Sequence, residues 1–433
     1  MQRRMCCSRL GESSKLFDLY PRKRLNVRRR QLARLSLGVV AALAIPGTAS
    51  AARTAIPAGK FYNAIGINAH GVLYPANTWP QRLVELGILN VRGRVGQSTT
   101  FVSQLGPFFA NGGKITTNIV QSSGGTLDKV GAAKSLAFLK TYVGPQRVAG
   151  IEGPNEFNNT GTRPANWASV ELDYIKWQHD AVRADSAFNS VPLIAPSVWT
   201  RLVTDYRALG DISAWVDKGC IHYYSGFRRP TLTGPTAYNM VQALRDASML
   251  SLAKPIWMTE TGWMTAGNVP MSQRAQAKYV LRDYFDAFGN GVEKVFDYQL
   301  MDDDTNLYGI TDASARPKLA FYALKNLAAL VKDGGGGSGA LDYSVTGAPT
   351  SLKQMLLQKS DGSFLLVLWL DVDSYNLSQR RDIETMLPAT INLGRPGSFE
   401  VYQPTFSATA QSSGSGQSIP VFVGDQITVV RIH

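Results

Sequence analysis

The sequence predicts a (β/α)8 barrel, a TIM barrel, followed by an all-β sandwich domain. Strand-like and helix-like segments alternate from about residue 60 to residue 332, a glycine-rich stretch follows, and only strand-like segments come after it. This alternation is typical of parallel sheets covered by helices, with a doubly wound sheet as the alternative to the barrel. The chain has 433 residues, of which 44% are hydrophobic and 18% charged. It is long enough for a barrel of about 250 residues and a second domain.

Eight short apolar segments are the expected barrel strands, and the barrel domain is assigned to residues 52–332. Strands buried on both faces of a parallel sheet have near-continuous apolar sequences rather than alternating ones. The eight segments are residues 62–69, 87–93, 113–121, 147–155, 191–197, 217–223, 255–260 and 293–300.

The intervening segments have helical periodicity. The clearest helix is expected between the last two strands, where Ser272 is a suitable N-cap and Gly289-Asn290 a suitable end. Its apolar residues recur at spacings of three and four, which places them on one face of a helix. They are Ala277, Val280, Leu281, Tyr284, Phe285 and Phe288.

The end of the chain has a different pattern. Residues 333–340, Asp-Gly-Gly-Gly-Gly-Ser-Gly-Ala, have the composition of a flexible linker. Beyond them, apolar runs at 352–359 and 364–371 flank the turn-forming pair Asp361-Gly362, which predicts a β-hairpin. Residues 341–433 are therefore expected to form the sandwich domain, packed against the barrel.

The positive charge of the chain is concentrated at its N-terminus. Residues 1–51 contain eleven of the 45 Lys and Arg residues and two of the 32 acidic residues, so +9 of the net charge of +13 lies there. The remaining residues carry only +4, which does not indicate a nucleic-acid-binding surface.

The N-terminal segment has the features of an export signal. Arg28–Arg30 precede the apolar run Leu35–Ile45, and the small residues Ala49-Ser50-Ala51 follow. The run has eleven residues, fewer than the about 20 needed to span a bilayer. We therefore expect cleavage after Ala51, no stable membrane insertion of the mature protein, and a periplasmic or extracellular location. General secretion and twin-arginine export both fit, and a translation start near Val27 would shorten the unusually long leader.

Cysteine and histidine usage excludes several kinds of site. Cys220 is the only cysteine beyond the leader, so the mature chain has no internal disulfide and no thiolate zinc site. No phosphate-binding loop, dinucleotide fingerprint or serine nucleophile elbow occurs. The four histidines lack metal-ligand spacing, so neither a metal nor a cofactor is expected, and the oligomeric state stays open. They are His70, His179, His222 and His433.

Two glutamates end strand-like segments where turns begin. Glu156 ends Gly-Ile-Glu-Gly-Pro-Asn-Glu at 150–156, and Glu260 lies in Trp-Met-Thr-Glu-Thr-Gly-Trp at 257–263. In a parallel barrel the C-terminal ends of all strands meet at one mouth, where active sites lie. Two carboxyl groups there, one protonated and one ionised, are the minimum equipment for cleaving a glycosidic bond.

The barrel region, from about residue 60 to 332, resembles the clan A glycoside hydrolases, which are retaining enzymes with carboxylates on strands 4 and 7. The domain behind it is similar to that of family 39 enzymes. In that clan an Asn-Glu pair ends strand 4, which Asn155-Glu156 matches. The resemblance implies that Glu156 is the general acid/base, that Glu260 is the nucleophile, and that Asn155 donates a hydrogen bond to the sugar 2-hydroxyl.

Residues on two other strands match the same clan. Arg92, which ends the second expected strand, resembles the arginine beneath the nucleophile, with Arg94 as the alternative register. A guanidinium there would keep the nucleophile ionised. His222 and Tyr224 are similar to the clan's His-x-Tyr, which implies that the Tyr224 hydroxyl points at the nucleophile, with Tyr223 as the alternative.

Other residues are candidates for substrate contacts. His70, after the first strand, could line the sugar site or be a buried structural histidine. Trp199 and Trp263, after the fifth and seventh strands, could stack on the apolar faces of sugar rings or belong to the core. Many clan members end strand 8 with a tryptophan beneath the reacting sugar, which residues 296–301 lack. Glu152 lies four residues before Glu156 and is expected on the same face of the fourth strand, deeper in the barrel.

We therefore predict an exported retaining β-glycosidase that acts on an oligo- or polysaccharide. One alternative is a transglycosylase that remodels the producer's own glycans, and the other is a non-catalytic carbohydrate-binding barrel. A binding protein need not retain Asn155, Glu156, Tyr224 and Glu260 together, which disfavours the second alternative. The sequence does not specify the sugar, the linkage, or endo or exo action.

Overall fold

The computed structural model describes residues 51–71, 74, 78–120, 122–123, 125–159, 163–199, 203–232, 239–266, 271–303 and 307–433. The expected export leader lies outside these ranges, apart from Ala51. Within them, every helix is too short or too polar to cross a bilayer.

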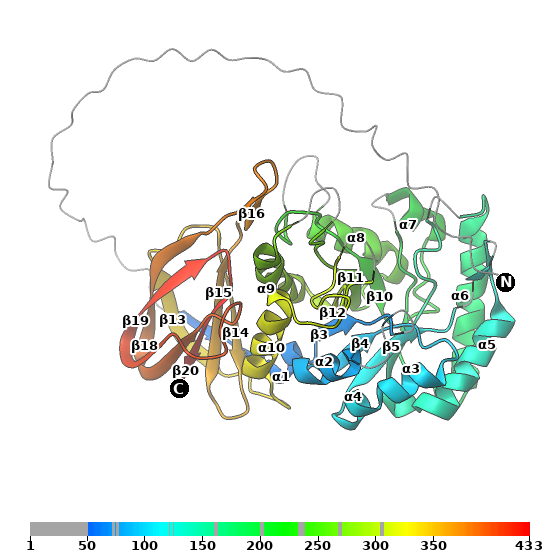
Figure 1. Ribbon diagram of the computed structural model, residues 1–433, viewed down its shortest axis with the longest axis horizontal. Helices are drawn as coiled ribbons and strands as arrows, with labels where there is room; N and C mark the ends of the chain where they lie inside the picture. Colours follow the sequence, from blue (N-terminus) through cyan, green and yellow to red (C-terminus); the bar gives the residue numbers. More distant parts are fainter. Residues whose placement is uncertain are drawn as a thin grey trace, which may run out of the picture. The chain divides into compact units, whose positions relative to one another are not determined.

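Eight parallel strands form the expected barrel (Figure 1). They follow one another in the order β10-β11-β12-β3-β4-β5-β8-β9, and a bridge between Ile194 and Lys218 brings the first and last strands together. The sheet therefore curls into a ring, which confirms the barrel and excludes the doubly wound alternative. The strands, all at expected positions, are β3 (Ile65–Asn68), β4 (Asn90–Arg92), β5 (Lys114–Asn118), β8 (Val148–Glu152), β9 (Leu193–Ile194), β10 (Gly219–His222), β11 (Ile256–Thr261) and β12 (Val292–Asp297).

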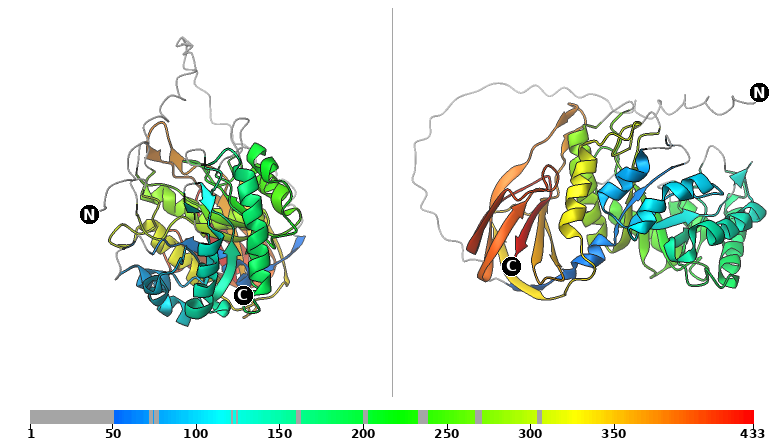
Figure 2. Two further views of the ribbon diagram at one scale, coloured as in Figure 1. Left: turned by 90° about the vertical axis from the view of Figure 1, so that its right-hand side faces the viewer. Right: turned by 60° about the horizontal axis from the view of Figure 1, so that its bottom comes forward.

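Helices connect these strands and cover the outside of the barrel (Figures 1 and 2). Side-chain caps begin several of them: Ser272 Oγ accepts a hydrogen bond from the backbone nitrogen of Ala275 at 2.9 Å, as its position before α9 predicted. The helices are α1 (Ala58–Tyr62), α2 (Trp79–Leu86), α3 (Thr99–Gln104), α4 (Gly106–Ala110), α5 (Lys129–Phe138), α6 (Trp167–Ala184), α7 (Val203–Leu209), α8 (Met240–Ser251), α9 (Gln273–Gly289) and α10 (Leu319–Val331).

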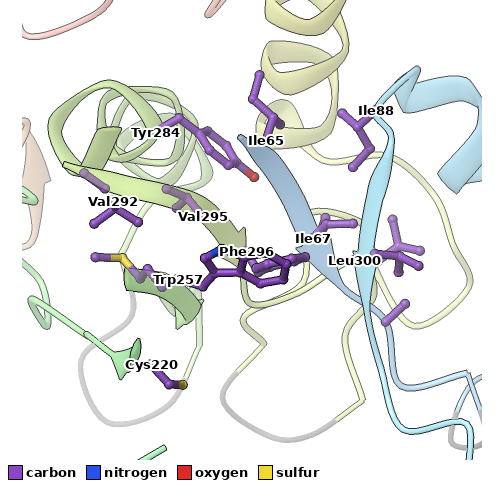
Figure 3. Packing of buried hydrophobic residues seen from close by; sticks show 14 of the residues in the cluster. Ile65, Ile67, Ile88, Cys220, Trp257, Tyr284, Val292, Val295, Phe296 and Leu300 are labelled. Carbon is purple, nitrogen blue, oxygen red and sulfur yellow. The ribbon is translucent and has the colours of Figure 1, made fainter. Parts of the chain in front are cut away.

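The barrel interior is filled by apolar side chains from neighbouring strands. Figure 3 shows Trp257 of β11 and Phe296 of β12 side by side, and their ring centroids are 6.3 Å apart. Gly66 makes this packing possible, because a Cβ atom there would lie 2.5 Å from the ring of Phe296. The filled interior leaves the C-terminal ends of the strands as the place for a site.

The remaining long strands form one mostly antiparallel sheet in the order β1-β13-β18-β20-β15-β14-β2, with β19 paired to β18. Two of them come from before the barrel: β1 pairs with β13 and β2 with β14. The barrel proper therefore begins after residue 57. The strands are β1 (Ala51–Thr54), β2 (Ile56–Pro57), β13 (Ala340–Thr346), β14 (Leu352–Gln358), β15 (Phe364–Leu370), β18 (Met386–Tyr402), β19 (Ser412–Gly424) and β20 (Thr428–Ile432).

Strand β15 is buried on both faces. Leu365, Val367 and Trp369 pack into the barrel core, whereas Leu366 and Leu368 pack into the separate core of the β-domain. Successive side chains of a strand point to opposite faces, so one strand contributes to both cores. The ring of Trp369 lies 5.7 Å from that of Phe285 on α9, and the right-hand view of Figure 2 shows the sheet lying along α10.

The glycine-rich connection is not a free tether, although its composition predicts flexibility. The backbone nitrogen of Gly59 donates to Gly335 O, and that of Ala55 donates to Gly339 O, both at 2.8 Å. Gly336 has a φ of +101°, and a Cβ atom there would lie 2.2 Å from Gln358 O. The glycines therefore allow the backbone to pack closely against the start of the barrel.

Asp286 on α9 is a buried acid between the two domains, 4% exposed. Its Oδ1 accepts a hydrogen bond from Trp369 Nε1 at 3.1 Å. Burial raises the pKa of Asp286 to about 7. Folding therefore favours the protonated carboxyl, whereas the unfolded chain ionises this group near its ordinary pKa.

We expect this group to make the protein less stable as pH rises from about 4 to about 7, because the unfolded chain loses its proton first. Each unit of pKa difference corresponds to about 1.4 kcal/mol. Asp286→Asn, which cannot ionise, should flatten that part of the stability profile. Denaturant midpoints measured every half pH unit test this, and a variant profile parallel to the wild type would contradict it.

Candidate active site

Glu156 and Glu260 lie together at the C-terminal mouth of the barrel. Glu260 is on β11 and 8% exposed, whereas Glu156 follows β8 by four residues and is half-buried. A carboxylate oxygen of each, with one ring nitrogen of His222, lie within 4.8 Å of one another. The two carboxyl groups are therefore close enough to contact the same bound molecule.

The backbone of Glu156 has an uncommon conformation. Its φ is +46°, in the left-handed region that residues other than glycine seldom adopt. The nitrogen of Glu156 donates to Ser197 Oγ at 3.1 Å and to Ser197 O at 3.2 Å. These contacts with the segment after β9 fix the direction of the Glu156 side chain.

Arg92, at the end of β4, contacts Glu260, and Arg94 is exposed instead. Arg92 is 6% exposed. Its Nη1 donates to Glu260 Oε1 at 2.7 Å and its Nη2 to Asn155 Oδ1 at 2.6 Å. The guanidinium therefore orients both the expected nucleophile and the expected amide donor.

Glu152 is a third carboxylate, fully buried below Arg92. It accepts hydrogen bonds from Arg92 Nε at 2.6 Å and Nη2 at 2.9 Å, which is a bidentate pair. Thr259 Oγ1 donates to it at 3.1 Å, and Asn68 Oδ1 accepts from Arg92 Nη1 at 2.9 Å. The alternation of side chains along the strand predicted that Glu152 lies deep in the barrel. The sequence did not identify Arg92 as its partner.

His222 and Tyr224 contact the glutamates from the segment at the end of β10. His222 Nδ1 lies 2.7 Å from Glu156 Oε1 and 3.4 Å from Glu260 Oε2. The hydroxyl of Tyr224 donates to Glu260 Oε2 at 2.9 Å. Tyr223, the alternative in the other register, points away and donates to Pro230 O at 3.0 Å.

These charges set the protonation of the site. Burial raises the pKa of Glu260, but the charges of His222 and Arg92 and the hydrogen bonds from Arg92 and Tyr224 outweigh it, so the pKa is below its usual value. Burial lowers the pKa of His222, but the carboxylates of Glu260 and Glu156 outweigh it and raise that pKa. The site therefore favours an ionised Glu260 beside a protonated imidazole.

A cleft of about 340 Å3 opens over Glu260. His70 lines it, together with Arg94, Asn155 and Phe157. The cleft thus combines hydrogen-bond donors with an aromatic ring, which is the lining typical of a small-molecule site.

Two tyrosines that the sequence did not suggest stand at the end of β12 and beyond it. The ring of Tyr298 lies 5.2 Å from that of His70, and Tyr308 lies 5.6 Å from Tyr224. The two tyrosine rings are 5.7 Å apart. This half-buried cluster lies at the end of the eighth barrel strand, where the sequence has no tryptophan.

The two tryptophan candidates differ. Trp263 is 1% exposed, stacks near Tyr279 and donates its indole N–H to Arg228 O at 3.0 Å. Of the two alternatives for Trp263, the structure supports the core position, because its ring is buried among other core residues. Trp199 follows β9, is 46% exposed and keeps an accessible ring.

Two groups of side chains among the described residues have the proximity needed for a metal ion. One is Glu156, His222 and Glu260, and the other is Glu152, Cys220 and His222. Arg92 already binds oxygens of Glu152 and Glu260. A cation would therefore compete with a guanidinium, and ion pairing explains the arrangement without a metal.

Comparison with solved structures finds the same architecture. A family 39 glycoside hydrolase from Bacteroides cellulosilyticus WH2 is 14% identical, with a TM-score of 0.60 over 86% of this chain and 82% of the other. A β-xylosidase from Caulobacter crescentus CB15 is 13% identical, with a TM-score of 0.59 over 88% and 97%. A glucosidase from Croceicoccus marinus is 10% identical, with a TM-score of 0.59 over 89% and 99%.

The fold is shared with these glycoside hydrolases. It includes the barrel and the β-domain behind it, as the sequence predicted. No protein-family model matches the sequence, and no curated protein does.

We expect Arg92→Met to lower the free energy of unfolding by about 3–5 kcal/mol near pH 7, because it leaves the buried Glu152 carboxylate without its partner. Adding Glu152→Gln to this variant should recover much of the loss, because the neutral amide costs less to bury unpaired. Chemical denaturation of the single and double variants measures both effects. A single variant as stable as the wild type would contradict this.

Proposed function

We propose that the protein is a glycoside hydrolase that cleaves β-glycosidic bonds of an oligo- or polysaccharide with retention of configuration. The observation that carries the proposal is the pairing of Glu156 and Glu260 within 4.8 Å, with Glu260 held by Arg92 and Tyr224. The shared fold supports it, because the similar structures include a β-xylosidase and a glucosidase.

In the first step Glu260 attacks the anomeric carbon, and the bond between that carbon and the leaving oxygen breaks. Its lowered pKa keeps it ionised, as a nucleophile must be. Glu156 gives its proton to the leaving oxygen, so the alcohol departs neutral. The product of this step is an ester between Glu260 and the sugar.

In the second step Glu156 takes a proton from a water molecule, whose oxygen attacks the anomeric carbon and releases Glu260. The ester carries no charge, so it removes the negative charge that helps to raise the pKa of His222. His222 therefore holds its proton less firmly during this step and interferes less with Glu156 as a base.

The cleft supplies contacts for the sugar. Asn155 Oδ1 accepts from Arg92, which directs the amide nitrogen of Asn155 to serve as the donor for the 2-hydroxyl. His70 lines the cleft and Trp199 has an exposed ring, so both are proposed substrate contacts. A transglycosylase would use the same first step with a sugar hydroxyl in place of water.

The proposed substrate location follows from the leader. The arginines and apolar run before Ala51 support export, so we propose that the enzyme acts on carbohydrate outside the cytoplasm. N-terminal sequencing of the protein from its host should find a start near Ala52, and an intact leader would count against export.

Variants of the two glutamates test the proposal. Glu260→Ala should lose nearly all turnover of every substrate, by a factor of about 10⁴ or more, because no ester forms. Glu156→Ala should keep the first step with a dinitrophenyl glycoside, whose leaving group needs no proton. Azide should then restore turnover of Glu156→Ala and give the β-glycosyl azide, because the anion needs no general base.

Glu85→Ala, an exposed glutamate on α2, is the matched control and should keep wild-type turnover. Azide rescue of Glu260→Ala should give the opposite anomer. An inverted azide product from Glu156→Ala would contradict the assigned roles. Absence of turnover by the wild type on a broad panel of aryl glycosides and polysaccharides would favour the carbohydrate-binding alternative.

A further inference from the structure

The segment after β10 connects the nucleophile to the rest of the barrel mouth. Tyr224 binds Glu260, and the adjacent Tyr223 donates to Pro230 O at 3.0 Å. Trp263, three residues after the nucleophile, donates to Arg228 O at 3.0 Å. The backbone carbonyls of Arg228 and Pro230, both in the turn 225–232, therefore accept hydrogen bonds from Trp263 and Tyr223. In the sequence these two donors lie close to Glu260 and Tyr224, which contact each other.

The same turn is bound by two carboxylates of the β-domain. Arg229 Nε lies 3.1 Å from Asp371 Oδ1, and the backbone nitrogen of Arg229 donates to Asp373 Oδ1 at 3.1 Å. The hydroxyl of Thr231 also donates to Asp371. The Asp371 side chain is only 16% exposed and that of Arg229 21%, so water screens this ion pair less than it screens a fully exposed one.

The β-domain side of this contact is fixed to the barrel by α9. Arg282, which is fully buried, donates from Nη1 to Val372 O at 2.7 Å. The hydroxyl of Tyr279 accepts from the backbone nitrogen of Ser374, also at 2.7 Å. Residues 371–374 are therefore held on one side by α9 while their carboxylates hold the turn on the other.

We propose that Asp371 and Asp373 are positioning residues for the active site, and that they fix the turn 225–232 so that Tyr224 stays on Glu260. The inference rests on the proposed function for its catalytic consequence, but the positioning itself is a property of the fold. Neither aspartate touches the reacting atoms. The β-domain thereby acts on catalysis without supplying a catalytic group.

The consequence for the reaction has a definite sign. The hydrogen bond from Tyr224 is one of the contacts that lower the pKa of Glu260. A loosened turn weakens that bond and lets the pKa rise, so the nucleophile ionises only at higher pH. The acid limb of the pH–rate profile therefore moves to higher pH, while KM changes little because the cleft lining is untouched.

Two variants break the contact from opposite sides. Asp371→Asn removes the charge on the β-domain, which also lies 3.6 Å from Arg282 Nη2. Arg229→Gln removes the charge on the turn and leaves the Asp371–Arg282 pair in place. Asp361→Asn is the matched control, because Asp361 lies in the hairpin turn at the other end of β15 and pairs with Arg431 at 2.6 Å. All three replace one partner of an Asp–Arg pair that involves the same domain.

Hydrogen–deuterium exchange of the full chain without substrate measures directly how firmly the turn and the segment after the nucleophile are held. We expect faster exchange in peptides covering 223–232 and 257–266 for Asp371→Asn and Arg229→Gln, and wild-type exchange there for Asp361→Asn. In kinetics we expect kcat to fall about tenfold for the first two, as for loss of one positioning contact, with the acid limb shifted upward. Tyr224→Phe should show the same upward shift, and adding it to Arg229→Gln should give little further loss.

Wild-type exchange in both peptides for both variants would overturn the proposal. So would a loss of kcat that only follows the unfolded fraction in thermal melts, with the pH profile unmoved. Faster exchange in the two variants, together with a wild type that turns over no glycoside, would support the positioning and count against the proposed function alone.

Discussion

The buried guanidinium of Arg92 joins four side chains of the barrel mouth. It donates to Asn68 at the end of β3, to Glu152 on β8, to Asn155 after β8, and to Glu260 on β11. Burying charges costs free energy unless each is paired with good geometry, and here one cation faces two carboxylates. The carboxylates of Glu260 and Glu156 raise the pKa of His222, which lies 3.9 Å from Glu152 and 3.4 Å from Glu260.

This charge balance explains why the two glutamates can differ. Glu260 is held by Arg92 and Tyr224 and is nearly buried, whereas Glu156 is more exposed and shares a contact with His222. Unequal environments are what separate a nucleophile from an acid/base in a pair of carboxylates. The β-domain belongs to this arrangement, because Asp371 and Asp373 bind the turn that follows Tyr224.

The sequence predicted the barrel and the positions of its catalytic candidates because both follow from local patterns. Apolar runs located all eight strands, and the residues that end them, Arg92, Glu156 and Glu260, had to share one mouth. Contacts between distant segments were not predictable in this way. The sequence did not identify Tyr298 as part of the site, and it left Trp263 as either a sugar platform or a core residue, because a local pattern does not tell which aromatic ring a distant turn covers.

The sequence analysis also did not predict that segments outside the expected β-domain contribute strands and contacts to it. Strands β1 and β2 precede the barrel but pair with the β-domain, since short strands are recognisable only by their partners. The contact between Arg229 and Asp371 joins residues 142 positions apart, with no motif at either end. Long-range polar contacts of this kind depend on how the domains dock, which no local pattern encodes.

Trapping of the covalent intermediate tests the central claim most directly. A panel of activated 2-deoxy-2-fluoro glycosides slows the second step of a retaining glycosidase, so a sugar ester should accumulate and be visible by intact mass. We predict that peptide mapping places that ester on Glu260 for at least one sugar of the β series, and that Glu260→Ala forms none. Labelling of Glu156 instead, or steady turnover of a matching substrate without any ester on Glu260, would contradict the account.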